Sequence, residues 1–309
     1  MPDEEIHFHC AGLNSAGVTL AGTFAAVPEP VAAALLITGS GKLNRDSDAR
    51  TIKTRVTRQL ADGLAAAQVS TLRYDKPGTG ASGGSYLHAG MADNLAAARA
   101  AAAWLSEHAA GLPVFAVGHS EGTYYAAQLA ADAAVAGAVL LGAPARSGQR
   151  IIEWQIEKLA PTLPRMALLV MRLIHFDFVR SQHKRLARLR ASTTDVVRMT
   201  GVRVNARWFR DFLAYDPATV LPGITVPVLA ITGGNDLQVP PEDTDAIGRL
   251  VGGPFEGHVL GDLNHLLRPD PQRRGLQGYR RSVRQPVSQE LIEIINAWVK
   301  NCLLAAAAE

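Results

Sequence analysis

The chain has 309 residues, of which 48% are hydrophobic, and its formal net charge is +3. This length and apolar fraction are ample for a large buried core and predict a globular protein. The small net charge and the dispersed basic residues give no indication of a nucleic-acid partner.

The N-terminus and the hydropathy pattern predict neither a signal peptide nor a membrane span. Residues 1–5 lack the basic and apolar regions of a secretory signal, which favours a cytoplasmic location. No uninterrupted apolar run reaches the ~18 residues that a membrane-spanning helix needs. Cys10 and Cys302 lie near opposite ends of the chain without metal-ligand spacing, so neither a metal site nor a structural disulfide is expected.

The N-terminal part of the chain alternates strand and helix patterns. The first two strand patterns are separated by Gly12, Asn14 and Gly17, which predicts an antiparallel opening. The later segments alternate buried strands with amphipathic or alanine-rich helices. In chain order we expect strands at 6–11, 18–27, 32–38 and 68–73, and helices at 51–67 and 91–108.

The segment Val114–Gly122 predicts a strand, a sharp turn and a helix. Its apolar run ends in the pattern G-x-S-x-G, formed by Gly118, Ser120 and Gly122, and helix-favouring residues follow. A serine at the tip of such a turn has a strained backbone and an exposed hydroxyl, and the two glycines allow the strand and the helix to pack closely. The helix N-terminus favours the negative charge that develops in acyl transfer. Ser120 is therefore the candidate nucleophile.

Attack by Ser120 on a carbonyl requires two N–H donors for the resulting oxyanion. One donor is expected from the residue after the nucleophile, Glu121, and the other from a loop after an early strand. The glycine-rich turn after the strand at 32–38 supplies the second candidate, Ser40, with Gly41 as the alternative. The same loop contains Arg45 and Asp46, which either pair to fix the loop or are solvated.

Another glycine-rich loop, residues 73–84, follows the strand at 68–73. We expect Asp75 to organise this loop by accepting hydrogen bonds from backbone N–H groups, and not to act as a catalytic acid. A phosphate-binding loop is the alternative, but the Walker spacing with its Lys-Ser/Thr pair is absent.

Strands that alternate with helices at this spacing predict a parallel sheet with helices on both faces and a site at the carboxyl ends of the strands. A further strand is expected at 135–141. From about residue 147 strand patterns vanish and helical periodicity persists. We therefore predict a helical cap, residues 147–223, inserted into a core formed by residues 1–146 and 224–309.

Two segments of the predicted cap have more than one interpretation. Met166–Phe176 is apolar and either lines an acyl-binding pocket, touches a membrane surface or packs within the cap, and packing within the cap is preferred. The basic run Arg180–Arg190 is expected to be a solvated helix face, with docking of an anionic substrate such as an acyl-CoA as the alternative.

The C-terminal part supplies an acid and a histidine in the order expected after a nucleophile. A strand at 226–232 runs into Asp236, and His265 follows the last strand, so both lie at the same edge as Ser120. Asp262 is too close to His265 in sequence to serve easily as its partner, so Asp236 takes that role. Ser288 is expected to cap a final helix, residues 288–304, that packs on the sheet.

Together these motifs resemble the α/β-hydrolase superfamily across nearly the whole chain, and more narrowly a bacterial group of capped carboxylesterases related to serine aminopeptidase-like hydrolases. The resemblance implies an eight-stranded, mostly parallel sheet, a Ser-His-Asp triad and no cofactor. The His-Gly pair that is frequent before the oxyanion loop is here Thr38-Gly39, which leaves the backbone donor intact. The matching segments are Thr38–Gly41, Arg73–Ser82, Gly118–Gly122, Tyr215–Pro217, Gly233–Pro240 and Leu263–Leu266.

The resulting hypothesis is hydrolysis of a small-molecule carboxylic ester through an acyl-enzyme, with Ser120 as nucleophile, His265 as general base and Asp236 orienting the imidazole. Acyl-CoA thioester hydrolysis, peptide hydrolysis of the aminopeptidase type and a non-enzymatic binding protein stay as alternatives. Peptide hydrolysis needs an acidic group for the substrate amine, for which the candidates are Glu121, Glu153 and Asp211. The sequence leaves the natural substrate, the acyl-chain length and a homodimer open.

Overall fold

A single eight-stranded sheet forms the centre of the computed structural model, which describes residues 3–13, 17–163, 165–173, 176–272 and 275–308. The strand order is β1-β2-β4-β3-β5-β6-β9-β10. The pairs β1/β2 and β2/β4 are antiparallel and all other pairs of this sheet are parallel, which confirms the expected mostly parallel sheet. The strands are β1 (Glu4–Cys10), β2 (Val18–Ala25), β3 (Ala32–Ile37), β4 (Val69–Tyr74), β5 (Val114–His119), β6 (Gly137–Leu141), β9 (Val228–Gly233) and β10 (Phe255–Leu260).

The central strands are buried along their whole length, as expected where helices cover both faces of a parallel sheet. Successive residues of β3 show the two faces directly. Leu35 and Ile37 belong to one hydrophobic cluster, whereas Ala34 and Leu36 belong to another on the opposite face. At the edge of the sheet, β1 instead alternates buried and exposed side chains.

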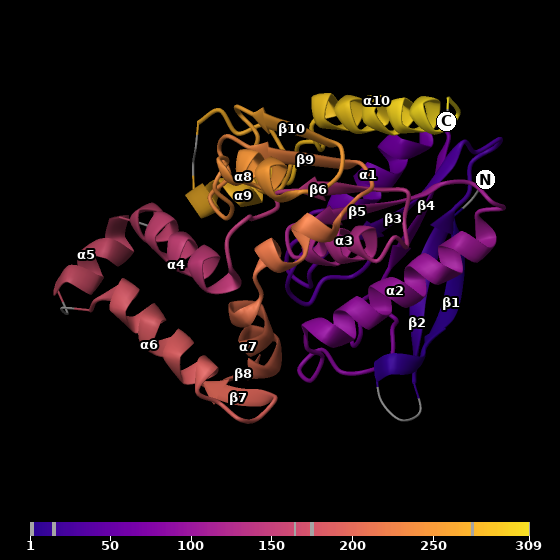
Figure 1. Ribbon diagram of the computed structural model, residues 1–309. Coiled ribbons are helices and arrows are strands. Elements are labelled where there is room, and N and C mark those ends of the chain that lie inside the picture. The colour runs from indigo at the N-terminus through magenta and orange to yellow at the C-terminus, as the bar shows by residue number, and fades with distance from the viewer. Residues whose placement is uncertain (1–2, 14–16, 164, 174–175, 273–274, 309) are drawn as a thin grey trace.

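Helices cover each face of this sheet (Figure 1). The helices α2 (Met91–His108), α3 (Gly122–Ala131) and α8 (Asp243–Leu250) contribute apolar side chains to the cluster that contains Leu35. The helices α1 (Val56–Ala65) and α10 (Gln289–Ala306) contribute to the other cluster. Ser288 caps α10 as predicted, because its Oγ accepts a hydrogen bond from the backbone N–H of Leu291 at 3.4 Å.

The segment between β6 and β9, which we call the inserted segment (residues 147–223), lies beyond the end of the sheet in Figure 1. It contains a two-stranded hairpin, so the expectation that strands are absent from it is wrong. Its tight turn places Thr200 and Gly201 at φ values of 48° and 83°. The elements are α4 (Gly148–Leu159), η2 (Ala160–Thr162), α5 (Arg165–Leu173), α6 (Phe178–Arg190), β7 (Val196–Met199), β8 (Val202–Asn205), α7 (Ala206–Ala214), η3 (Pro217–Thr219) and η4 (Leu221–Gly223).

Four large apolar side chains in or next to α5 do not pack within the inserted segment as preferred above. Met166, Leu169, Leu173 and Phe176 are exposed by 70%, 50%, 69% and 44%. The preferred interpretation of this stretch is therefore wrong for these four side chains. The adjacent helix α6 presents its basic residues to solvent, as predicted. Outside the inserted segment, the remaining described elements are η1 (Ala11–Leu13) and α9 (Gly275–Ser282).

Candidate active site

Ser120 stands at the tip of the turn between β5 and α3, with φ at 54°. The two flanking glycines are required by contacts with the backbone. A Cβ on Gly118 would lie 2.3 Å from the carbonyl oxygen of Gly122, and a Cβ on Gly122 would lie 2.3 Å from the carbonyl oxygen of Ile37. The strand and the helix thus approach each other closely enough to hold the serine in its strained conformation.

The structure brings Ser120, His265 and Asp236 into one hydrogen-bonded chain. Ser120 Oγ lies 3.0 Å from His265 Nε2, and His265 Nδ1 lies 2.7 Å from Asp236 Oδ2. The other carboxylate oxygen, Oδ1, accepts hydrogen bonds from the backbone N–H groups of Gln238 at 2.7 Å and Val239 at 2.9 Å. Asp236 and His265 are only 5% and 4% exposed. This arrangement can move a proton from the serine hydroxyl to the imidazole and stabilise the imidazolium.

A second histidine, His119, supports the loop of His265. Its Nε2 donates to the carbonyl oxygen of His265 at 2.8 Å, and the two ring centroids are 5.2 Å apart. Burial, reinforced by the charge of His265, lowers the pKa of His119 to about 3, so this imidazole stays neutral. Sequence reasoning assigned His119 no role, because it occupies the variable position of G-x-S-x-G.

The same loop is also held by Arg268, which is fully buried. Its guanidinium donates to the carbonyl oxygens of Leu266 at 2.7 Å and Gln285 at 2.8 Å, and also to that of Thr54. Burial lowers the pKa of Arg268 to about 10. Backbone carbonyls from three separate parts of the chain thus converge on one side chain directly after His265.

Ser40 and Glu121, the two expected oxyanion donors, lie beside the nucleophile. A Cβ on the preceding Gly39 would be 3.2 Å from the Cβ of Ser120, so the Ser40 loop touches the turn that carries the nucleophile. Within the described part of the chain, the backbone N–H groups of Ser40 and Glu121 have no acceptor in the protein. Both groups are therefore available for a ligand oxygen.

The carboxylate of Glu121 is buried and fully engaged. Its Oε2 pairs with Lys76 Nζ at 3.0 Å, and its Oε1 accepts from Trp208 Nε1 at 2.8 Å. The amide of Asn94 lies 3.3 Å from Oε1, and the hydroxyl of Tyr125 donates to the same oxygen. This carboxylate is not free to hold a substrate amine.

The other two acidic candidates already have hydrogen-bond donors in the protein. Asp211 accepts a hydrogen bond from the backbone N–H of Met91 at 3.0 Å, at the N-terminus of α2. Glu153 accepts from the side chain of Gln149 at 2.9 Å on the exposed side of α4. The sequence could not show this, because residue type alone does not reveal which carboxylates already have partners.

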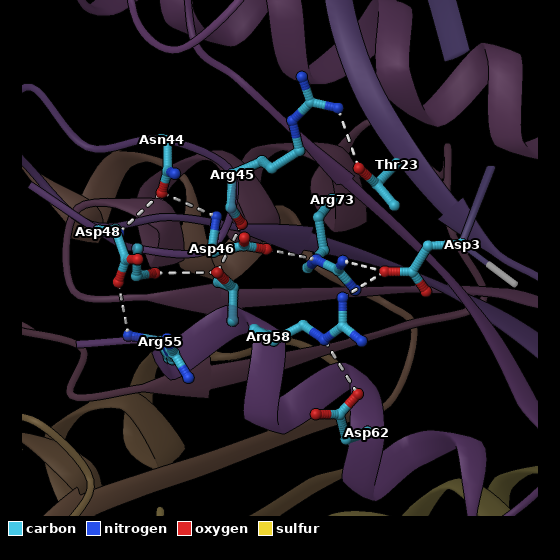
Figure 2. Close-up of polar contacts among 12 residues, drawn as sticks. Asp3, Thr23, Asn44, Arg45, Asp46, Asp48, Arg55, Arg58, Asp62 and Arg73 are labelled. Carbon is cyan, nitrogen blue, oxygen red and sulfur yellow. Dashed lines mark hydrogen bonds and ion pairs between the residues drawn. The ribbon is translucent and has the colours of Figure 1, made fainter. Parts of the chain in front are cut away.

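Asp75 organises the loop behind the site, as predicted. It accepts hydrogen bonds from the backbone N–H groups of Arg45 at 2.6 Å and Ala81 at 2.9 Å, and its Oδ2 pairs with the Arg45 guanidinium at 2.8 Å. Arg45 and Asp46 do not pair with each other. Arg45 extends to Thr23, whereas Asp46 accepts from Arg73 at 3.0 Å (Figure 2).

A cavity of about 340 Å³ opens beside Ser40 and Glu121. Its lining is largely apolar and aromatic. The cavity lies between the core and the inserted segment, and both contribute residues to its lining. The core contributes Ser40, Gly41, Lys76, Pro77, Tyr86, Leu87, Ala89, Asn94 and Glu121, and the inserted segment contributes Ile152, Arg203, Val204, Asn205, Trp208 and Phe209. No residue of α6 lines this cavity in the described part of the chain.

The described ranges contain neither a metal-binding cluster nor a membrane-spanning helix. No group of three or more His, Cys, Asp or Glu side chains there has a metal-binding arrangement. None of the helices in those ranges combines the length and the apolar character needed to cross a bilayer. Cys10 and Cys302 are both free thiols.

The sheet topology, the serine at the turn after β5 and the histidine after the last strand define an α/β-hydrolase. Residues 53–271 match the family described as serine aminopeptidase, S33. The chain belongs to this family.

Individual proteins with a similar sequence or structure include named esterases and a peptidase. Esterase EstD of Thermotoga maritima is 25% identical over 240 residues, which are 77% of this chain and 55% of that protein, so the chain spans about half the length of this curated relative. Est1E of Butyrivibrio proteoclasticus with bound ferulic acid has a TM-score of 0.63 at 18% identity, covering 98% of this chain and 100% of that chain. Proline iminopeptidase of Mycobacterium smegmatis has a TM-score of 0.64 at 16% identity, with coverage of 98% and 100%. The two structures show a common fold.

Proposed function

We propose that this protein is a serine hydrolase that cleaves carboxylic esters through an acyl-enzyme. The hydrogen-bonded chain from Ser120 through His265 to Asp236 carries this proposal, with distances of 3.0 and 2.7 Å. His265 removes the proton of Ser120 as the hydroxyl attacks the ester carbonyl. Asp236 keeps the Nδ1 proton on the imidazole and stabilises its charged form.

The tetrahedral oxyanion is held by the backbone N–H groups of Ser40 and Glu121, which lie beside the nucleophile and have no acceptor among the described residues. His265 then returns its proton to the leaving alcohol. In the second half-reaction it activates a water that attacks the acyl carbonyl and releases the carboxylic acid. The neutral state of His119 favours this cycle, because a second positive charge near His265 would oppose formation of the imidazolium.

An ester is a better match than a peptide with a free amino terminus. Glu121 is neutralised by Lys76, and Asp211 is occupied by a backbone N–H. The cavity lining presents aromatic and aliphatic groups, including Trp208 and Phe209, which suits an apolar acyl or alcohol group. The name of the esterase relative from Thermotoga maritima agrees with this choice.

An acyl-CoA thioester receives less support from the contacts. The basic residues of α6 would have to reach the bound nucleotide, but α6 does not contribute to the described lining of the cavity. The inserted segment 147–223 acts in this proposal as a cap, since it supplies one wall of the cavity.

The direct test is turnover of p-nitrophenyl esters of increasing acyl-chain length by the native chain and by Ser120→Ala. We expect turnover that depends on Ser120 and an optimum chain length that reports the size of the cavity. Acyl-CoA thioesters and amino-acid p-nitroanilides are compared in the same assay. If either of these substrates has a higher kcat/KM than the esters, that substrate class replaces the ester as the preferred one.

A further inference from the structure

A buried ion pair lies between the cavity and the nucleophile turn, outside the catalytic chain. The side chains of Lys76 and Glu121 are only 4% and 2% exposed, and Lys76 Nζ lies 3.0 Å from Glu121 Oε2. Burying two charges is costly, and an apolar pair of similar volume often gives a protein of equal or greater stability. The location of this pair therefore calls for a role beyond stability.

Lys76 makes a second contact that reaches the proposed oxyanion hole. Its Nζ donates to the carbonyl oxygen of Gly39 at 2.7 Å. This carbonyl and the N–H of Ser40 belong to the same planar trans peptide, so they point in opposite directions. An ammonium group that holds the carbonyl oxygen on one side fixes the direction of the Ser40 N–H on the other.

The second donor is fixed in the same way by a different residue. The peptide between Ser120 and Glu121 has its carbonyl oxygen held by the backbone N–H of Thr123 at 2.9 Å and by Thr123 Oγ1 at 2.6 Å. The N–H of Glu121 is thereby aimed away from Thr123. One peptide of the oxyanion hole thus depends on a local turn, whereas the other depends on Lys76.

Glu121 fixes Lys76 and also contacts the inserted segment. Its Oε1 accepts from Trp208 Nε1 at 2.8 Å, and Trp208 belongs to α7. Loss of Glu121 would free both the ammonium group and this indole. The carboxylate therefore joins the Ser40 loop, the nucleophile turn and one wall of the cavity.

We propose that Lys76 and Glu121 are positioning residues that preorganise the oxyanion hole, with Lys76 orienting the N–H of Ser40 and Glu121 holding Lys76 in place. This inference rests on the proposed ester hydrolysis. Neither side chain exchanges a proton with the substrate. The pair acts on the transition state, where charge accumulates on the carbonyl oxygen, and has little effect on binding of the uncharged ester.

The test uses the double variant Lys76→Met/Glu121→Gln, which removes both charges together and so leaves no unpaired buried charge. We expect kcat to fall by about 10- to 100-fold with KM nearly unchanged, less than the ~10²–10³ for complete loss of an oxyanion donor, since the Ser40 N–H is still present. Affinity for phenylboronic acid, which forms a tetrahedral adduct on a serine, should fall by a similar factor.

A matched control is the double variant Arg146→Met/Asp243→Asn. It removes another pair with a buried carboxylate, in which Arg146 and Asp243 are joined by two hydrogen bonds from Nε at 3.0 and 3.1 Å. No hydrogen bond or ion pair joins Arg146 or Asp243 to Ser40 or Glu121 among the described residues. We expect it to change thermal stability but neither kcat nor boronic acid affinity.

Three outcomes would overturn the inference, and only one of them also overturns the function on which it rests. If the native chain turns over esters in a Ser120-dependent manner but the Lys76→Met/Glu121→Gln variant keeps kcat and boronic acid affinity, the positioning role is wrong and the ester hydrolysis stands. A native chain without Ser120-dependent turnover overturns both. Equal losses in the two double variants would assign the pair a structural role and also overturn the inference.

Discussion

The carboxyl edge of the sheet and the inserted segment differ in how their side chains are held. At the sheet edge, His265 and Asp236 are buried and each has several polar partners. In the inserted segment, Met166 and Leu173 are about two-thirds exposed, whereas Trp208 is fixed by its bond to Glu121. The chemistry is thus placed on the most constrained part of the molecule, and the inserted segment contributes to the site through a few anchored residues.

The largest effect is expected from the sheet edge, in the variant Asp236→Asn. An amide leaves the shape intact but favours the wrong imidazole tautomer, so we expect kcat for a p-nitrophenyl ester to fall about 10⁴-fold. Thermal unfolding followed by circular dichroism serves as the control for folding. A loss of less than tenfold in a folded variant would show that Asp236 does not orient His265.

The next largest effect concerns packing at the nucleophile turn. In Gly118→Ala the added methyl group meets the carbonyl oxygen of Gly122 at 2.3 Å, so we expect unfolding free energy to fall by about 1–3 kcal/mol or more. The matched control is Gly261→Ala, where the added Cβ has no neighbour within 4 Å among the described residues. Urea unfolding compares the two, and equal stabilities would contradict the close approach of β5 and α3.

An effect that is smaller within any one pH unit follows from the neutral His119. Its pKa is about 3 in the folded chain and about 6.5 in the unfolded chain, so the unfolded state takes up the proton first as pH falls. The contribution of His119 to the unfolding free energy is fully present above pH ~6.5. It declines by up to about 1.4 kcal/mol per pH unit as the pH falls from there toward pH ~3.

The variant His119→Gln tests this dependence. It keeps an N–H donor for the carbonyl of His265 but does not titrate, so its unfolding free energy should fall less steeply between pH 6 and pH 4. Urea unfolding at a series of pH values gives both slopes. Parallel slopes for the native and variant chains would show that His119 is not held neutral in the folded state.

The smallest effect is expected from the exposed side chains of the inserted segment. Met166→Gln and Leu173→Gln replace exposed apolar groups, so we expect unfolding free energy to change by no more than about 0.5 kcal/mol. The value of kcat/KM for a short ester should stay the same, because neither residue lines the cavity. A clear loss of activity in either variant would show that α5 contacts the substrate. The inserted segment would then contribute to the site through more than the few anchored residues.

The sequence predicted the sheet, and it predicted that Ser120, His265 and Asp236 lie together at one edge, because the information for both is local. Ser120, Asp236 and His265 each follow a buried strand, and parallel strands bring their carboxyl ends to one edge. At the majority of strand ends, the observed boundary differs from the predicted one by one or two residues. For example, β4 spans Val69–Tyr74, whereas the predicted strand was 68–73. The helix α2 (Met91–His108) has the predicted bounds.

Contacts between distant parts of the chain were not predictable in the same way. Lys76 and Glu121 are 45 positions apart. The sequence singled out Glu121 for other reasons and Lys76 only as part of the segment Arg73–Ser82. The adjacency of Arg45 and Asp46 suggested that they pair with each other. Instead, Arg45 pairs with Asp75 and Asp46 accepts a hydrogen bond from Arg73. Likewise, the apolar pattern of α5 carries no information about what covers it, and the structure leaves Met166, Leu169 and Leu173 exposed.

The acyl-enzyme is the central claim, and a rapid-mixing assay with p-nitrophenyl acetate tests it most directly. We expect a burst of p-nitrophenol close to one equivalent of protein, followed by slower steady turnover when deacylation limits the rate. Mass spectrometry after acid quench should detect a covalent acetyl group on Ser120. In Ser120→Ala both the burst and the acetyl group disappear. A burst of the same size in Ser120→Ala, or an acetyl group on another residue, would contradict the account.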